Sequence, residues 1–143
     1  MRFYALLTAM LTTSVVFSSA LMAETPNIKP GFWQHNTSLS LQGPFNMPPQ
    51  VTTDQECVTQ ADIDKGVDVL DLPPGCSLSH YNIRRDSADY SMKCDIQGMR
   101  ADFTGKLNFH GDTMNGSMSS DVETPMGVMT MLMQTEARRL RDC

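Results

Sequence analysis

The stretch that decides the fold class is residues 100–110, RADFTGKLNFH, in which apolar and polar side chains alternate. One set of alternate positions carries Ala101, Phe103, Gly105, Leu107 and Phe109, and the other set is polar or charged throughout. Successive side chains of a β-strand point to opposite faces of the sheet, so this period of two places the apolar side chains together. The stretch therefore predicts an antiparallel strand with one buried and one solvated face.

Further segments of the chain have the composition of short strands and are separated by Gly, Pro, Asn and Asp. They are residues 32–41, 51–58, 76–85, 89–97, 113–122 and 128–141. Residues 43–50 contain three prolines, which a central strand does not tolerate, so we expect a loop there. The last segment also suits a helix over 132–140, but the alternation of its methionines favours a strand.

One short helix is expected over residues 60–65. Thr59 is a good N-cap, Asp62 would lie in the first turn, and Gly66 is placed to end the helix. Together these segments predict an all-β domain. It would be an antiparallel meander of six to seven short strands, barrel-like or folded as a sandwich, with one short helix.

The N-terminus has the layout of an export signal. Arg2 supplies a positive charge, residues 3–17 contain no charged side chain, and small residues follow. Cleavage is expected after Ala23, with Ala20 as the alternative. The segment is too short and too rich in hydroxyl side chains for a membrane-spanning helix.

Removal of residues 1–23 would leave residues 24–143, a single disulfide-bonded β-rich domain free in the periplasm. A lipoprotein anchor would need a cysteine directly after the cleavage site, and the first cysteine is Cys57. Loss of Arg2 leaves 10 basic residues against 16 acidic ones, a net charge of -6. Nucleic-acid binding rests on clustered Lys and Arg, so we expect no nucleic-acid partner. The basic cluster near the C-terminus, Arg138, Arg139 and Arg141, is interpreted as a solvated strand end.

The four cysteines indicate two disulfide bonds, because an even number in an exported chain is the usual sign of a disulfide framework. They are Cys57, Cys76, Cys94 and Cys143. Their spacing contains no CxxC pair, which argues against a structural zinc site and against a thiol oxidoreductase. Three pairings are possible. We favour Cys57 with Cys76 and Cys94 with Cys143, since the shorter loop is easy to close.

The order of several short motifs resembles domain-of-unknown-function family 3617. The motifs are Lys29-Pro30-Gly31-Phe32-Trp33, Cys57-Val58-Thr59, Pro74-Gly75-Cys76, Cys94, a Gly-Asp turn followed by Met114 and Met118, Met129-Thr130-Met131 and a terminal Arg-Asp-Cys. The resemblance spans nearly the whole chain after the signal. It implies a small, exported, β-rich proteobacterial protein and no established activity. Gln34 departs from the acidic residue expected after the Trp, so no role is assigned there.

Nine of the 12 methionines lie after residue 23, and four of these fall within eight residues. The four are Met126, Met129, Met131 and Met133. Thioethers are soft ligands that suit Cu(I), so this segment is a candidate metal site. The competing and favoured interpretation is that flexible methionines fill an irregular core. A third possibility is an exposed methionine face that binds apolar partners.

No motif of an enzyme is present. His35, His80 and His110 are isolated in the sequence, and neither a GxSxG elbow nor a glycine-rich phosphate loop occurs. Trp33 is interpreted as a core residue or a plug at a barrel end, and a barrel could enclose an apolar ligand beside Phe103 and Phe109.

We therefore expect a non-enzymatic periplasmic domain that needs no cofactor and binds either a small apolar molecule or an envelope protein. The alternative is Cu(I) handling through the methionine-rich strand, and a hydrolase ranks third.

Overall fold

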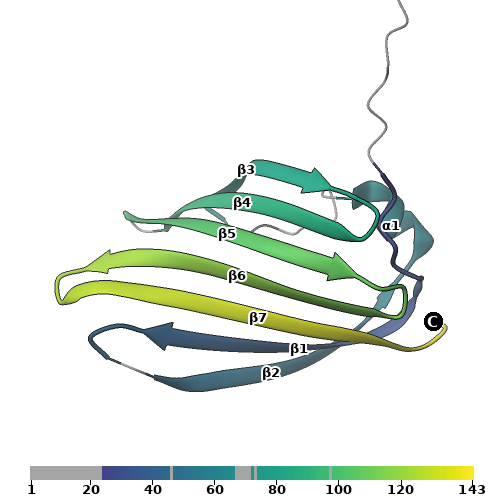
Figure 1. The fold of residues 1–143 in the computed structure, drawn as a ribbon, viewed down its shortest axis with the longest axis horizontal. Coiled ribbons are helices and arrows are strands. Elements are labelled where there is room, and N and C mark those ends of the chain that lie inside the picture. The colour runs from purple at the N-terminus through teal and green to yellow at the C-terminus, as the bar shows by residue number, and fades with distance from the viewer. Residues whose placement is uncertain (1–23, 46, 67–71, 73, 97) are drawn as a thin grey trace, which may run out of the picture.

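The computed structural model describes residues 24–45, 47–66, 72, 74–96 and 98–143. The expected signal peptide, residues 1–23, lies outside the described residues. Within them, seven strands form one antiparallel sheet with one short helix (Figure 1). The elements are β1 Gly31–Gln42, β2 Met47–Val58, α1 Gln60–Lys65, β3 Cys76–Ile83, β4 Ser87–Ile96, β5 Met99–Phe109, β6 Thr113–Thr124 and β7 Gly127–Arg141. The predicted all-β antiparallel class is confirmed.

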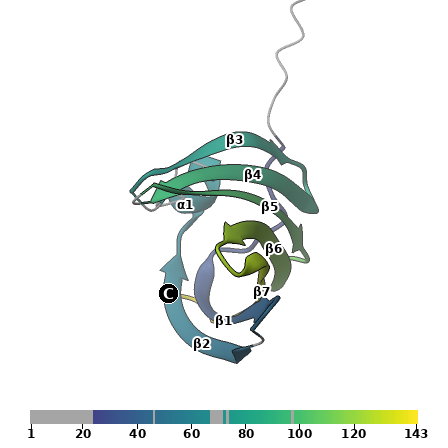
Figure 2. The same ribbon diagram turned by 90° about the vertical axis from the view of Figure 1, so that its left-hand side faces the viewer.

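The strands lie in the order β2-β1-β7-β6-β5-β4-β3. Five consecutive strands, β3 to β7, form a meander, and the β1–β2 hairpin joins it through pairing of β1 with β7. Seen from one end, the sheet is strongly curled (Figure 2). Its edge strands β2 and β3 do not pair among the described residues, so the sheet is not closed into a barrel, and the strands do not divide into the two sheets of a sandwich.

Residues that lie opposite each other on paired strands have their side chains on the same face, so the alternation of residues 101–109 extends to the neighbouring strands. Leu107 of β5 lies opposite Gly116 of β6 and Ala88 of β4, and Phe103 lies opposite Ser120 and Met92. The same parity continues through β7 and β1, so one face holds most of the large apolar side chains, with His35, Thr37 and Thr135 among them, and the other face is mainly polar. The apolar face collects Trp33, Leu39, Leu41, Ala88, Met92, Phe103, Leu107, Phe109, Met114, Met118, Met129, Met131, Met133 and Ala137.

The helix α1 begins and ends at the predicted residues. Thr59 and Asp62 form a capping box, in which the Asp62 N–H donates to Thr59 Oγ1 and the Thr59 N–H donates to Asp62 Oδ2. Hydrogen bonds from the Thr59 hydroxyl and backbone N–H hold the pKa of the Asp62 carboxyl below its usual value. Ile63 is the buried residue of the helix, and a Cβ on Gly66, just after it, would lie 3.8 Å from the Ile83 side chain of β3.

Strand β2 is longer than the sequence suggested. It begins at Met47, so Pro48 and Pro49 lie inside a strand rather than in the expected loop over residues 43–50. The physical reason is position. The strand β2 lies at the edge of the sheet, and its pairing with β1 is irregular between Leu39 and Leu41, opposite the two prolines, so neither proline interrupts a regular ladder.

The disulfide pairing differs from the one we favoured. The bonds join Cys57 to Cys143 and Cys76 to Cys94. Cys76 and Cys94 lie directly opposite each other on β3 and β4, where the Cβ atoms of paired residues are close enough to bridge. Cys57 lies opposite Phe32 on β1, and Phe32 lies opposite Arg141 on β7, so the chain end reaches Cys57. The favoured pairing was wrong because the chain crosses to the other edge of the sheet between Cys57 and Cys76.

Two glycines on the apolar face make room for large neighbours. A Cβ on Gly105 would lie 2.7 Å from the Tyr90 ring atom Cε1, so this ring covers the Gly105 backbone. Burial raises the pKa of the Tyr90 hydroxyl. A Cβ on Gly116 would lie 2.8 Å from the carbonyl oxygen of Lys106 and would also meet Leu107. Gly116 therefore requires glycine, whereas a side chain at position 105 would displace the Tyr90 ring.

We expect Gly116→Ala to lower the free energy of unfolding by about 1 to 3 kcal/mol, since the new methyl group collides with backbone as well as with Leu107. Urea denaturation with intact disulfides measures the change. Ser119→Ala, on the polar face of the same strand, is the matched control and should stay within about 0.5 kcal/mol of the wild type. Equal stability of the two variants would contradict the close packing at Gly116.

Removal of the Cys57–Cys143 bond should cost more than removal of the Cys76–Cys94 bond. Their sequence separations are 86 and 18 residues, and in the chain-entropy model the difference is 1.5RT ln(86/18), about 1.4 kcal/mol. The two double Cys→Ser variants, compared by urea denaturation, test this order. The opposite order would show that native contacts, rather than the entropy of the unfolded chain, decide the contribution of each bond.

Candidate functional site

The most unusual surface lies where two hairpins end together, at the left of Figure 1. We call residues 38–45, 47–51 and 124–134 the apolar end; none of them is charged. Five of the seven large hydrophobic residues that are exposed in the described chain lie there. They are Phe45, Met47, Val51, Met126 and Val128, with exposed fractions from 46% to 66%. Large apolar side chains that are exposed together at one end of a molecule commonly mark an interaction site.

Close backbone packing joins the two hairpins of the apolar end. A Cβ on Gly43 would lie 2.9 Å from the carbonyl oxygen of Val128, and one on Gly127 would lie 3.2 Å from Pro44. Gly43 and Gly127 have φ angles of 152° and 120°, which favour glycine. The Thr124 hydroxyl donates to the Gly127 carbonyl oxygen at 2.7 Å and fixes the β6–β7 turn. The exposed side chains are therefore carried by a structured support.

Three of the four predicted metal-site methionines lie together beside this end. Met129, Met131 and Met133 occupy alternate positions of β7, all on the apolar face and all half-buried. Met118 of β6 lies opposite Met133, which adds a fourth thioether that the sequence did not single out. Met126 instead lies exposed in the β6–β7 turn.

Ser120 is a buried polar residue on the apolar face of the sheet, beside the methionines. It lies opposite Met131 on β7 and Phe103 on β5, and only 4% of its surface is exposed. Its hydroxyl oxygen has no hydrogen-bond partner among the residues that the structure describes. Such a group costs free energy, because its hydration is lost without replacement.

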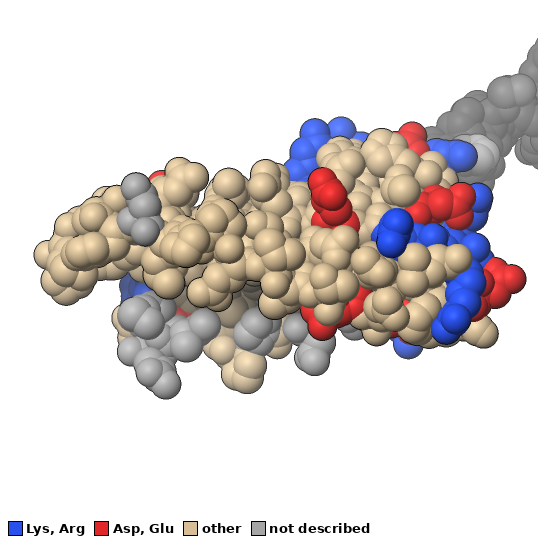
Figure 3. Space-filling model, turned by 90° about the horizontal axis from the view of Figure 1, so that it is seen from below, with Lys and Arg blue, Asp and Glu red and all other residues tan. Residues whose placement is uncertain are grey.

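Charge is distributed very unevenly along the molecule. In Figure 3 the apolar end is largely tan, whereas the red and blue of the charged residues are concentrated in the other half of the molecule. The acidic residues nearest to the apolar end in the sequence are Glu123 and Glu136, followed by Asp54 and Asp121. A molecule that binds at the apolar end therefore contacts apolar and uncharged polar side chains.

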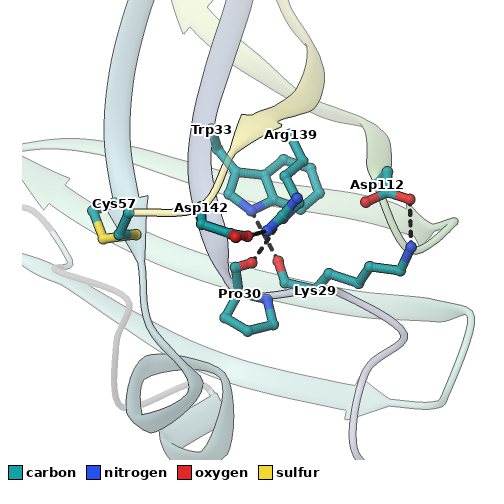
Figure 4. Close-up of polar contacts among 8 residues, drawn as sticks. Lys29, Pro30, Trp33, Cys57, Asp112, Arg139 and Asp142 are labelled. Atoms are coloured by element: carbon teal, nitrogen blue, oxygen red, sulfur yellow. Dashed lines mark hydrogen bonds and ion pairs between the residues drawn. A yellow bond between two sulfur atoms is a disulfide. The ribbon is translucent and has the colours of Figure 1, made fainter.

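The opposite end is tied together by polar contacts around Trp33 (Figure 4). The Trp33 indole N–H donates to the Lys29 carbonyl oxygen at 3.0 Å, and Arg139 Nε donates to the Pro30 carbonyl oxygen at 2.7 Å. Arg139 also pairs with Asp142, next to the Cys57–Cys143 bond. Trp33 is only 2% exposed, which confirms it as a core residue. We interpret this end as a structural anchor.

The arginine cluster belongs to this anchor only in part. The side chain of Arg141 lies over the Phe32 ring, 4.8 Å from its centroid, and Arg139 makes the contacts described above. Arg138 is exposed on the polar face of β7.

The histidines are not brought together. His35 Nε2 lies 3.1 Å from Glu56 Oε1, whereas His80 and His110 are exposed. Across the described residues, no group of three or more His, Cys, Asp or Glu side chains could hold a metal ion. Among the same residues, no histidine forms hydrogen bonds with both a serine and an aspartate, the arrangement that a serine hydrolase would need.

Two recesses of the surface lie over polar residues. Neither is lined by Phe103 or Phe109, the residues expected around an apolar ligand. Phe109 is instead a core residue that is 4% exposed. The apolar candidate site is thus an open surface at one end of the sheet.

Sequence reasoning missed Phe45, Met47, Val51 and Val128. Period-two alternation says which side chains share a face but not which part of that face is covered. The signal that was present is the absence of charge over residues 38–51 and again over residues 124–134.

The comparisons with known proteins identify a family. In the described part of the chain, no helix is long and apolar enough to cross a membrane. No curated protein matches the chain, and neither does any solved structure. The family model described as "Protein of unknown function (DUF3617)" matches residues 28–143, so the chain belongs to the DUF3617 family.

Proposed function

We propose that this chain is a non-enzymatic binding domain of the bacterial periplasm that holds an envelope protein against its apolar end. The observation that carries the proposal is the gathering of five exposed apolar side chains in two charge-free hairpins. The two disulfides support an extracytoplasmic location, because such bonds persist in oxidising compartments.

The open shape of the apolar end favours a protein partner over a small apolar molecule. Binding of a small molecule rests on a concave pocket that covers most of the ligand surface. Phe45, Met126 and Val128 instead project from hairpin tips and leave more than half of their surfaces exposed. Aromatic residues and methionine are enriched at the centres of protein interfaces, which matches this composition.

A photo-cross-linker in place of Phe45 should give one discrete adduct with an envelope protein in living cells. The matched control is Tyr81 on the far edge strand β3, which is 53% exposed and also aromatic, and a cross-linker there should give no such adduct. Met126→Ser should reduce the adduct at position 45 at least fivefold, because loss of one apolar anchor of an interface costs about 1 kcal/mol or more. Equal adducts at positions 45 and 81, or none at position 45, would contradict the proposal.

A second candidate function is Cu(I) handling, favoured by one observation: Met129, Met131 and Met133 share a face of β7, and Met118 lies opposite Met133. Thioether sulfur is a suitable donor for Cu(I). No cysteine of the described chain is free, so thiolates do not compete for the metal while both disulfides are intact.

Native mass spectrometry of the oxidised protein with Cu(I) under anaerobic conditions tests this second function. Stoichiometric copper is expected if the face binds metal, and it should be lost when Met129, Met131 and Met133 are replaced by Leu, which keeps the apolar volume. Met114→Leu, near the opposite end of the same face, is the control. Copper that stays bound in the triple variant would exclude this site.

A further inference from the structure

The polar face of the sheet contains a recess of about 500 Å³ that borders the apolar end and shares Ser38, Val51 and Gln134 with it. Residues of β1, β2, β5, β6 and β7 line it, Gly116 and Thr135 among them. The others are Asn36, Ser38, Val51, Lys106, Asn108, Asn115, Ser117, Gln134 and Glu136. Their position is fixed by the same register that collects the apolar residues on the other face.

The strand register arranges these side chains in two adjacent rows that cross the sheet. One row runs from Asn36 through Glu136 and Asn115 to Asn108. The other runs from Val51 through Ser38, Gln134 and Ser117 to Lys106. Neighbouring strands are about 4.8 Å apart, and the rows are about 7 Å apart, so the recess is a grid of polar groups at regular spacing.

Several groups in the grid keep hydrogen-bonding capacity. Asn108 Nδ2 donates to Asn115 Oδ1 at 3.0 Å, which leaves the Asn115 amide N–H groups available as donors. Thr53 Oγ1 donates to Asn36 Oδ1 at 2.9 Å and likewise leaves the Asn36 amide N–H groups available. Amides thus offer donors and acceptors side by side.

The lining carries no net charge. Its two charged residues, Lys106 and Glu136, lie on different rows and different strands, and their opposite signs cancel. A second recess of about 250 Å³ shares Asn36, Asn115 and Glu136 with the first and continues towards Arg138 and Thr113. The polar surface is therefore elongated rather than a single compact pocket.

We propose that this polar face binds a neutral, hydroxyl-rich oligosaccharide. Sugar hydroxyls both donate and accept hydrogen bonds, as the side chains of Asn, Gln and Ser do. A lining without net charge does not select phosphate or another anion, and its polarity does not suit a lipid chain. The exposed Val51 side chain and the Gly116 backbone offer flat contact for the C–H groups of a sugar ring. The site lies on the opposite face from the methionines and borders the apolar end, with which it shares Ser38, Val51 and Gln134. It does not involve Phe45, Met126 or Val128, so it can hold whether or not the proposed function does.

The test is a titration of the isotopically labelled, oxidised protein with tetra-N-acetylchitotetraose and, separately, with maltotetraose, followed by NMR. Expected are shifts of the backbone amide signals of Asn36, Asn115, Ser117 and Gln134, with a Kd of about 1 mM or lower. Binding of chitotetraose alone assigns the specificity to the acetamido group, and binding of both sugars assigns it to the hydroxyl groups. Both results support the proposal.

Asn115→Ala and Gln134→Ala should each weaken binding roughly tenfold, since each removes hydrogen bonds to the ligand, while Ser119→Ala on the same face outside the lining should not. An unchanged dispersion of the amide signals shows that each variant is folded. No shift with either sugar would overturn the proposal, as would shifts confined to the hairpin tips around Phe45, Met126 and Val128 or binding that Asn115→Ala and Gln134→Ala leave unchanged.

Discussion

The pairing of β1 with β7 joins the beginning of the domain to its end. Eleven residue pairs connect the two strands, from Phe32 opposite Arg141 to Gln42 opposite Thr130. A two-stranded hairpin is at best marginally stable alone, so the β1–β2 hairpin depends on this contact. Both surfaces discussed above depend on it too: the apolar end combines the β1–β2 and β6–β7 hairpins, and both polar rows cross from β1 to β7.

The stabilising contacts are concentrated at one end of this pairing. Trp33 is buried there, the Cys57–Cys143 bond closes a loop of 86 residues, and Arg139 holds the backbone at Pro30. The Lys29–Asp112 ion pair nearby, at 2.6 Å, is exposed on both sides, so its contribution is small. Burial and the covalent bond therefore hold the anchored end together. The other end is left free to expose side chains that a core would otherwise hold.

Local pattern predicted the parts of the fold that depend on neighbouring residues. The alternation of residues 100–110 gave the correct faces of β5, and Thr59, Asp62 and Gly66 gave the correct helix. The pairing of cysteines and the length of β2 could not be read in this way, because both depend on the order of strands in space. The chain leaves β2 at one edge and re-enters the sheet at β3 on the other. Local sequence patterns contain no information about this change from one edge of the sheet to the other.

The candidate site, like the fold, was predicted only where it depends on neighbouring residues in the sequence. The methionines of β7 were placed correctly on one face, since period two is a local property. Their half-buried state was not, because the sheet is one curled layer and not a closed barrel, and no local pattern distinguishes the two. The same period explains why β7 serves two surfaces: Met131 and Met133 face one side while Gln134 and Glu136 face the other. A slip of one residue between β1 and β7 would turn Leu39 away from the methionines and Ser38 away from Gln134, so this register decides which residues β1 adds to each surface.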